Sequence, residues 1–496
     1  MYSLLFKTAL SSFLIASVAL PQEDLTRLYS EARQAQAAGD LTTATRRYES
    51  IVQRQPQMAE AFANLGNLYY QQGQANRAKE AYRTAVRLKP DLTGPRFFLG
   101  VIAFGEHDYS AALNYLKRAA DLQANNPLIH AYLGYTRYAR SEFGEATGEL
   151  EKAADLSPAD IDVLYHLGKS YGHLANDSFA RLQSEFPNSV YTVLVRAHLD
   201  ETREDWVAAG RQYSIALRKM PDNKRLREKS RWIEAKAAGA AVPDKGTTDE
   251  LVDASLAYKE TPPAGPRLRE EMARWQSKIR AFPSQTKTDR ELYLTAEGFQ
   301  ILSYLSSLAI FELDSDSYRA HQLRAQLLEE SNNDEGAIAE YREVIKRKPD
   351  LPNIHFAIGS LYWKDQKFDQ ARTELQQELK ANPNHAQALY EIADICAFQS
   401  RQQEAEKYFL AALKLKPAMM EAHFGLEKIY TESGRYEKSL YHLRAVLQSA
   451  PSDPAAHYRL ARVYQKMNRP QDADKELALF NQHRPQPGQN GSSTVK

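Results

Sequence analysis

Four histidines are the residues whose type and spacing most directly suggest chemistry. His321, His355, His423 and His457 lie 34 residues, or a multiple of 34, apart, and imidazole is a common zinc ligand. If each step is one helical unit packed on the next, neighbouring histidines are separated by about 10 Å, the distance between packed helix axes. Every ligand of one zinc ion lies about 2 Å from it. We therefore predict half-buried histidines at helix interfaces and no metal site.

The other reactive side chains form no catalytic pattern. The single cysteine, Cys396, falls inside a predicted helix, where a buried thiol is typical of packing. Glu149 and Glu151 lie on a predicted exposed helix face with lysines nearby. The sequence has no glycine-rich phosphate loop after a strand, no GxSxG motif and no HExxH motif. We therefore predict that the chain is not an enzyme and uses no cofactor.

Helical hairpins are the elements that must position these side chains. Residues 59–92 read as two amphipathic helices around a turn at Gly73, and Pro90 ends the second helix. A small residue recurs where the first helix must approach the second: Gly66, Gly100, Gly134, Gly168, Gly359, Ala393 and Ala461. A closing proline recurs in phase: Pro56, Pro90, Pro158, Pro221, Pro349, Pro383, Pro417 and Pro451. One hairpin cannot bury its own apolar face, so these units must stack.

This period and pattern resemble the tetratricopeptide repeat over most of the chain. The resemblance implies an all-α solenoid, a right-handed superhelix in which the first helix of each unit lines a concave face. Regular units are expected at 25–58, 59–92, 93–126, 127–160 and 190–223, and again at 318–351, 352–385, 386–419, 420–453 and 454–487. The unit that begins near Leu164 is irregular, and we expect its second helix to be compressed into 176–186.

The concave face implied by the resemblance is the candidate binding site. Aromatic residues recur at the fifth and twelfth positions of the units, with polar residues between them, which suits an extended or helical peptide. The same aromatic residues can also pack against the neighbouring helix. The candidate groove residues are Asn67, Tyr70, Phe97, Phe104, Tyr138, Tyr165, Lys169, Phe356, Trp363, Tyr390, Phe424, Lys428, Tyr458 and Arg462. Some family members clamp a C-terminal carboxylate with Asn and Lys, but Asn67 lacks the flanking lysines, so we do not predict that specificity.

The phase of the repeat also breaks after residue 237, and we place a boundary between two arrays there. The predicted N-terminal array covers 25–237 and ends in a capping helix at 223–237. An irregular linker is predicted at 238–266, a C-terminal array at 267–487 and a disordered tail at 488–496. The second array is expected to open with a helix at 267–282 and two short helices within 292–311.

Residues 1–19 have the features of an export signal. Lys7 precedes an apolar run over residues 8–20, and Ser17 and Ala19 provide small residues at a cleavage site. A retained anchor is the alternative, since extending the run back to Met1 reaches the roughly 20 residues that a span needs. We predict cleavage, no membrane span afterwards, and a location in the periplasm or cell envelope of a bacterium.

Bulk composition narrows the class of partner. The net charge of +1 gives no general attraction for nucleic acid, and one cysteine excludes an intramolecular disulfide. Together these patterns predict a non-enzymatic scaffold for protein or peptide partners. An envelope glycan or peptidoglycan strand is the alternative ligand, because aromatic rings also stack on sugars.

Overall fold

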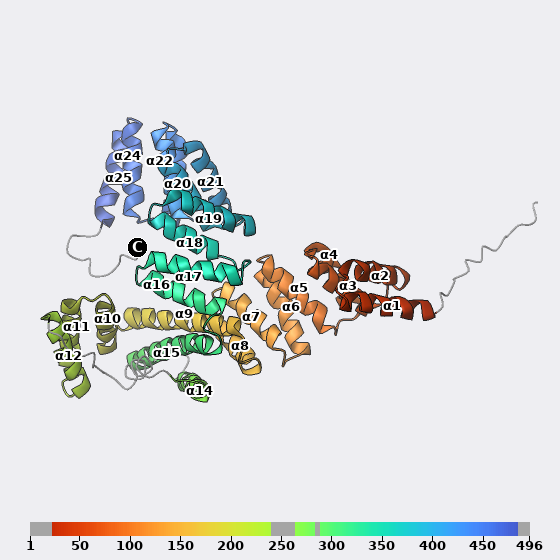
Figure 1. The fold of residues 1–496 in the computed structure, drawn as a ribbon. Helices are drawn as coiled ribbons and strands as arrows, with labels where there is room; N and C mark the ends of the chain where they lie inside the picture. Colours follow the sequence, from red (N-terminus) through yellow and green to blue (C-terminus); the bar gives the residue numbers. More distant parts are fainter. Residues whose placement is uncertain (1–21, 240–262, 283–287, 485–496) are drawn as a thin grey trace, which may run out of the picture. The chain divides into compact units, whose positions relative to one another are not determined.

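The computed structural model describes residues 22–239, 263–282 and 288–484, and every regular element in these ranges is a helix (Figure 1). The chain divides into two compact units, unit 1 (Met1–Leu313) and unit 2 (Asp314–Lys496). The predicted export signal, most of the predicted linker and the predicted tail lie outside the described residues. The prediction of an all-α repeat protein is confirmed.

Unit 1 begins with four antiparallel hairpins, continues into a long helix, and ends in a smaller helical group and two further helices (Figure 1). Its helices are α1 (Gln22–Ala37), α2 (Leu41–Arg54), α3 (Ala59–Gln71), α4 (Ala75–Leu88), α5 (Thr93–Gly105), α6 (Tyr109–Leu122), α7 (Pro127–Ala139), α8 (Phe143–Leu156), α9 (Ile161–Glu185), α10 (Val190–Thr202), α11 (Trp206–Lys219), α12 (Lys224–Ala237), α14 (Pro266–Arg280) and α15 (Asp289–Leu313).

Unit 2 consists of five regular hairpins and confirms the predicted repeat register from residue 318 onward. Each hairpin pairs a first helix with a second helix. The first helices are α16 (Tyr318–Glu330), α18 (Ile354–Lys364), α20 (Ala386–Phe398), α22 (Met420–Glu432) and α24 (Pro454–Lys466). The second helices are α17 (Asp334–Arg347), α19 (Phe368–Ala381), α21 (Gln402–Leu415), α23 (Tyr436–Ser449) and α25 (Pro470–His483).

The turn inside each hairpin is set by one residue with positive φ, the second residue after the end of the first helix. Gly73 has φ 71°, and the next residue, Gln74, donates its backbone N–H to the carbonyl of Tyr69 at 2.8 Å. This bond satisfies a carbonyl that the helix end would leave unpaired. Ser141 and Ser400 adopt the same left-handed conformation without being glycine. The turn geometry is therefore kept even where the residue with the least steric cost is absent.

The two helices of a hairpin approach most closely at the eighth position of the repeat. A Cβ atom placed on Gly134 would lie 2.5 Å from Cγ of Leu150, and one placed on Gly66 would lie 2.6 Å from the ring of Tyr82. Both distances are shorter than van der Waals contact. Glycine at this position therefore lets a large side chain of the second helix pack directly against the backbone of the first.

The fifth unit of unit 1 differs from the prediction. The expected break before 176–186 is absent, and α9 continues as one helix to Glu185. Residues 292–311, expected to hold two helices, belong to the single helix α15. These two helices pack against each other along much of their length. A Cβ atom on Gly168 would meet Cβ of Ser306 at 3.1 Å, so α15 supplies the second helix that the sequence following α9 does not.

This pairing also moves the boundary between the arrays. We expected the second array to begin at residue 267, but α14 and α15 both belong to unit 1. Gln276 of α14 donates a hydrogen bond to the hydroxyl of Tyr171 in α9 at 2.9 Å, across 105 residues of sequence. At the other end of α9, the hydroxyl of Ser189 donates to the carboxylate of Asp289 at 2.6 Å. The new boundary follows from these contacts between distant segments.

Among the described residues, α15 is also the one helix long and apolar enough to cross a membrane, judged by length and composition alone. Leu292, Leu302 and Leu305 of this helix are buried within unit 1. Leu302 and Leu305 pack in one cluster with Leu167 of α9 and Trp275 of α14. The apolar composition of α15 is therefore explained by its place in the core.

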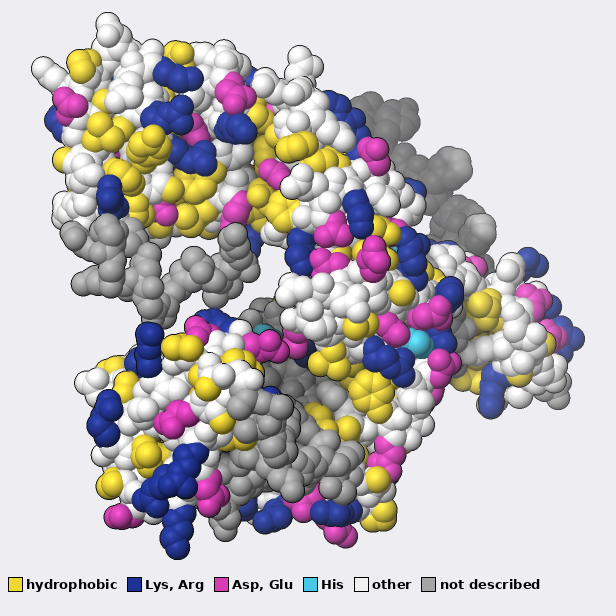
Figure 2. Space-filling view, turned by 60° about the vertical axis from the view of Figure 1, so that its left-hand side comes forward, with side chains coloured by type: hydrophobic (Ala, Val, Ile, Leu, Met, Phe, Trp, Pro, Cys, Tyr) yellow, Lys and Arg dark blue, Asp and Glu magenta, His cyan; other side chains and the backbone are white. Residues whose placement is uncertain are grey.

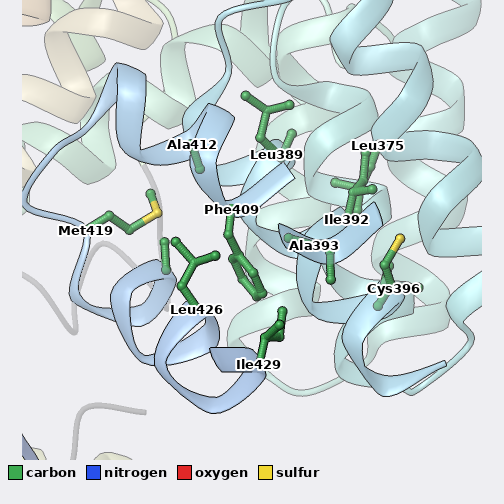
Figure 3. Close-up of a cluster of buried hydrophobic side chains, with 14 of the residues drawn as sticks. Leu375, Leu389, Ile392, Ala393, Cys396, Phe409, Ala412, Met419, Leu426 and Ile429 are labelled. Carbon is green, nitrogen blue, oxygen red and sulfur yellow. The ribbon is translucent and has the colours of Figure 1, made fainter. Parts of the chain in front are cut away.

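The largest core cluster of unit 2 lies between α19, α20, α21 and α22. Figure 3 shows the ring of Phe409 pointing toward the backbone of α22, near Leu426 and Ile429. A Cβ atom on Gly425 would lie 2.4 Å from this ring, which is a close approach between successive repeats. Cys396 is fully buried in the same cluster, and burial raises the pKa of its thiol. The prediction of a buried cysteine is confirmed, and the thiolate form is disfavoured there.

Substituting Gly168→Val should destabilise unit 1 by about 1–3 kcal/mol, because the added atoms overlap Ser306 in a closely packed interface. The measurement is urea unfolding of the full chain by circular dichroism, combined with hydrogen exchange of peptides from α9 and α15. Gly148→Ala in α8 is the control, since no atom lies within 4 Å of its added Cβ. Unchanged exchange in α9 and α15 of the valine variant would contradict the pairing described above.

Candidate functional site

Four first helices of unit 2, α18, α20, α22 and α24, form one continuous face. Helix α20 contacts both α18 and α22 directly. Several side-chain contacts join neighbouring first helices rather than the two helices of one hairpin. The indole N–H of Trp363 donates to the carboxylate of Asp394 at 3.0 Å, and Arg459 forms an ion pair with Glu427 at 2.7 Å. We call this surface the first-helix face of unit 2.

An aromatic line runs along this face at the fifth position of the last four repeats. It consists of Phe356, Tyr390, Phe424 and Tyr458. Each ring rests on a neighbour. Phe356 lies 4.5 Å from the ring of His385, and the guanidinium of Arg459 lies 4.7 Å above Phe424. Tyr458, which contacts Phe480, keeps 44% of its surface exposed. These rings are therefore fixed by packing and still present an edge to solvent.

A polar line runs beside the aromatic line, at the ninth position of the same repeats. Its members, in chain order, are Ser360, Asp394, Lys428 and Arg462. The line changes sign, since Asp394 is acidic whereas Lys428 and Arg462 are basic and exposed. No ion pair is recorded for either basic residue within the described part of the chain. Figure 2 shows Lys and Arg side chains among hydrophobic ones on the part drawn uppermost, which belongs to unit 2.

Glu391 reinforces the acidic end of the polar line. Its side chain belongs to α20, one turn before Asp394, and only 4% of the residue is exposed. The hydroxyl of Ser360 in α18 lies within 3.0 Å of both of its carboxylate oxygens. Burial raises the pKa of Glu391 to about 7, although the hydrogen bond from Ser360 acts in the opposite direction and lowers it. Glu391 is therefore held in place, in surroundings that disfavour its charged form.

The predicted groove residues of unit 1 form an aromatic chain instead of two lines. Phe97 and Phe104 of α5 both pack edge-on against Tyr132 of α7, at 5.5 and 6.0 Å between ring centroids. Tyr70 of α3 contacts Phe98 at 5.4 Å. Tyr138 continues this chain toward α9. Its ring lies 5.7 Å from the His166 ring and its hydroxyl 3.3 Å from Nε2 of His173.

The remaining predicted residues of unit 1 are partly used by the fold. The amide oxygen of Asn67 accepts a hydrogen bond from the hydroxyl of Tyr82 in the second helix of its own hairpin, at 2.8 Å. Tyr165 is 9% exposed, with the ammonium group of Lys169 6.0 Å from its ring. Nothing in the structure tests a binding role for the predicted groove residues, which stays a prediction.

The recurrent histidines pair with the second helix of their own hairpin, so the predicted interface position is confirmed. His355 is half-buried as predicted, whereas the other three are buried. Nδ1 lies 2.6 Å from a glutamate oxygen in the pairs His321–Glu340 and His457–Glu476, and 2.7 Å in His355–Glu374. His130, which the sequence argument did not include, repeats the arrangement with Glu149 at 2.6 Å. The described residues contain no group of three or more metal-ligating side chains placed to hold an ion.

One hairpin departs from this pattern. In unit 2, His423 faces His442 where the other hairpins that carry the recurrent histidine have glutamate, and the two Nδ1 atoms lie 2.9 Å apart. Nε2 of His423 lies 2.9 Å from the Pro417 carbonyl and donates to it, so in the neutral pair His442 donates to His423. Both residues are buried. Burial, together with the His423 charge, lowers the pKa of His442 to about 4, and nearby Glu406 only partly opposes this effect.

Comparison with known proteins identifies the repeat. Tetratricopeptide repeat models match residues 99–161 and 356–420, residues 35–97 and 430–488, and residues 325–366. Together these matches cover more than half of the chain. The chain belongs to the tetratricopeptide repeat family. No curated protein matches this sequence.

Solved structures add only a general similarity to this tetratricopeptide repeat chain. YrrB, a TPR protein with an unusual peptide-binding site, is 18% identical over 36% of this chain and 92% of its own, with a TM-score of 0.32. PilF of Pseudomonas aeruginosa is 13% identical over 43% and 93%, with a TM-score of 0.34. The Cut9–Hcn1 structure is 15% identical over 94% of both chains, also at 0.34. These scores carry no argument about function.

Some residues of the tetratricopeptide repeat face were missed by the sequence argument. Phe98, Tyr132, Glu391 and Arg459 all occupy the sixth position, next to the aromatic fifth position that the argument used. Asp394 occupies the ninth position, where Lys428 and Arg462 were included and the acidic member was not. Reading the ninth position through all repeats would have revealed the change of sign along the face.

Acid should weaken unit 2 through the imidazole pair. In the unfolded chain the pKa of His442 has its ordinary value near 6.5, whereas in the folded protein it is about 4. Between these two pH values the unfolded chain binds a proton at His442 that the folded protein does not bind. The free energy of unfolding is therefore undiminished above pH 6.5 and falls by up to about 3 kcal/mol as pH drops from 6.5 to 4. His442→Glu restores the carboxylate of the other hairpins and should remove much of this loss. The measurement is urea unfolding at a series of pH values.

The converse variant tests the same cause elsewhere in unit 2. Glu476→His places an imidazole opposite His457, which now pairs with Glu476 at 2.6 Å. This variant should gain an acid sensitivity of similar size between pH 6.5 and 4. Identical pH profiles for wild type and both variants would show that the imidazole pair does not set the acid stability.

Proposed function

We propose that this tetratricopeptide repeat protein is a non-enzymatic scaffold that binds protein or peptide segments along its first-helix faces. The observation that carries the proposal is the paired arrangement in unit 2, where an aromatic line and a polar line run side by side over successive repeats. Aromatic side chains that are fixed by packing bind a partner at low entropic cost, and charges beside them select among partners.

The first-helix face suits an elongated ligand better than a compact one. The same two positions recur in four successive hairpins, so equivalent contacts are offered at regular intervals. A peptide can repeat its backbone and side chains at such intervals. A glycan strand in the envelope is the second candidate ligand, because the exposed edge of Tyr458 and its neighbours could also stack on sugar rings.

We further propose that the chain is exported by a bacterium and works in the periplasm or attached to the envelope. The support is the sequence of residues 1–19, which combines a short apolar run with small residues at a cleavage site. A scaffold in that compartment would hold envelope proteins or their extended segments.

Removing two rings of the aromatic line should weaken partner binding. The double variant Tyr390→Ala/Phe424→Ala is expected to lose at least about tenfold in affinity, since aromatic anchors contribute on the order of 2 kcal/mol or more each. Partners are captured by crosslinking with the tagged chain in cells and identified by mass spectrometry. Binding is then measured with purified components, after circular dichroism has shown that the variant is folded.

Tyr441→Ala is the matched control, because Tyr441 is an aromatic residue of a second helix and is 68% exposed. It should bind the partner as wild type does. Retention of the wild-type protein on purified peptidoglycan, with no protein partner captured, would favour the glycan candidate. Equal binding by wild type and the double variant would exclude the aromatic line as the site.

Amino-terminal sequencing of the mature protein tests the location. We expect the mature chain to begin near Leu20, because the small residues Ser17 and Ala19 fit a signal-peptidase site. Cell fractionation should then place the mature protein in the periplasm or envelope. A mature protein that still begins at Met1 would show that the segment is not removed.

A further inference from the structure

The polar line of unit 2 carries charges in a fixed order, and this order has a chemical consequence. Along the chain the line reads Asp394, then Lys428, then Arg462, one residue from each of α20, α22 and α24. Members of the aromatic line lie four residues earlier in the same helices, which is about one helical turn. A ligand along this face therefore meets one acidic and two basic positions beside a row of rings.

Contacts within the protein keep the acidic end of the polar line apart from its basic end. Asp394 is held by the indole of Trp363 at 3.0 Å, with the Glu391 carboxyl one turn away. At the other end, Arg459 lies over Phe424 and is paired with Glu427 at 2.7 Å. Glu427 is buried and also accepts a hydrogen bond from the hydroxyl of Thr431 at 2.9 Å. The charge of Glu427 is thus neutralised within the protein by Arg459. Lys428 and Arg462 are the basic side chains of the polar line that stay exposed to a ligand.

The spacing of these positions selects a backbone conformation. Neighbouring first helices lie roughly 10 Å apart, as packed helices do. A polyproline II segment advances about 9 Å per turn of three residues, so every third side chain faces the same way. In a β-strand, side chains three residues apart point to opposite faces. The polyproline II conformation is therefore the one that meets each repeat with an equivalent side chain. Rows of aromatic side chains also suit proline rings.

We propose that the first-helix face of unit 2 binds a proline-rich polyproline II segment with acidic side chains at two positions three residues apart, opposite Lys428 and Arg462, and a basic side chain three residues further along, opposite Asp394. This inference rests on the proposed peptide-binding function and specifies its ligand. The charges enter as side chains of the ligand, so a free C-terminal carboxylate is not required.

Fluorescence anisotropy with labelled peptides tests the proposal on the full-length protein. The probe is acetyl-Lys-Pro-Pro-Glu-Pro-Pro-Glu-Pro-Pro-amide, together with a second peptide in which the order of the three charged residues is reversed, since either chain direction can satisfy the pattern. One of the two should bind at least about tenfold more tightly than the charge-exchanged peptide with Glu, Lys and Lys at those positions. The preference should weaken as salt is raised.

Charge reversal in the protein provides the second measurement. The variant Lys428→Glu/Arg462→Glu should no longer bind the acidic probe. It should instead bind a peptide with three lysines at the same spacing. The control Lys407→Glu/Lys414→Glu changes the charge equally on α21, a second helix, at two exposed positions. It should bind the probe as wild type does.

Two results would overturn the inference. The first is equal binding of the acidic and charge-exchanged peptides, or no binding of either. The second is a Lys428→Glu/Arg462→Glu variant that behaves as the control does. If a protein partner is nevertheless captured through the aromatic line, the scaffold function stands and only this ligand assignment fails. If the aromatic line is also dispensable for capture, both proposals fail.

Discussion

The close approach of two helix backbones at the eighth position of the repeat is the constraint on which this structure depends. At Gly134 there is no room for a Cβ atom, because Leu150 fills the space above the backbone. That contact fixes the distance and register between the helices of a hairpin. Stacked hairpins with the same register then place equivalent residues at equal intervals, and this regularity turns the fifth and ninth positions of unit 2 into two continuous lines.

Most of the fold was predictable because the repeat is local. Small residues, turn residues and closing prolines lie within one unit, so their period defines the hairpins without tertiary information. The α9–α15 pair was not predictable in the same way. Gly168 carries the signature of a first helix, but no break follows it before Pro187, and nothing local shows that the missing partner comes from α15. Pairing between distant segments is decided by the packing of the whole unit.

The sequence predicted where the residues of the candidate site lie in the repeat, but not which of their side chains are available to a ligand. The period located the aromatic line, since a ring recurs at one position of successive units. Which side chains are left for a ligand depends on contacts between neighbouring helices, such as Tyr82 with Asn67 or Glu427 with Arg459. Such contacts follow from how neighbouring helices pack, within a hairpin or between hairpins, which a single sequence does not specify. The imidazole pair of His423 and His442 shows the same limit, because it became visible only against the glutamates of the other hairpins.

The α9–α15 pair has a consequence for the order in which the protein folds during synthesis. Hairpins from α1 to α8 need only their neighbours, so they can close one after another as the chain leaves the ribosome. Helix α9 instead waits for α15, whose first residue, Asp289, accepts a hydrogen bond from Ser189, just beyond the end of α9 and 100 residues away in the sequence. Until α15 has been made, the apolar side of α9 stays uncovered. Unit 1 therefore contains a slow, late step of high contact order within a class of protein that usually folds through local contacts.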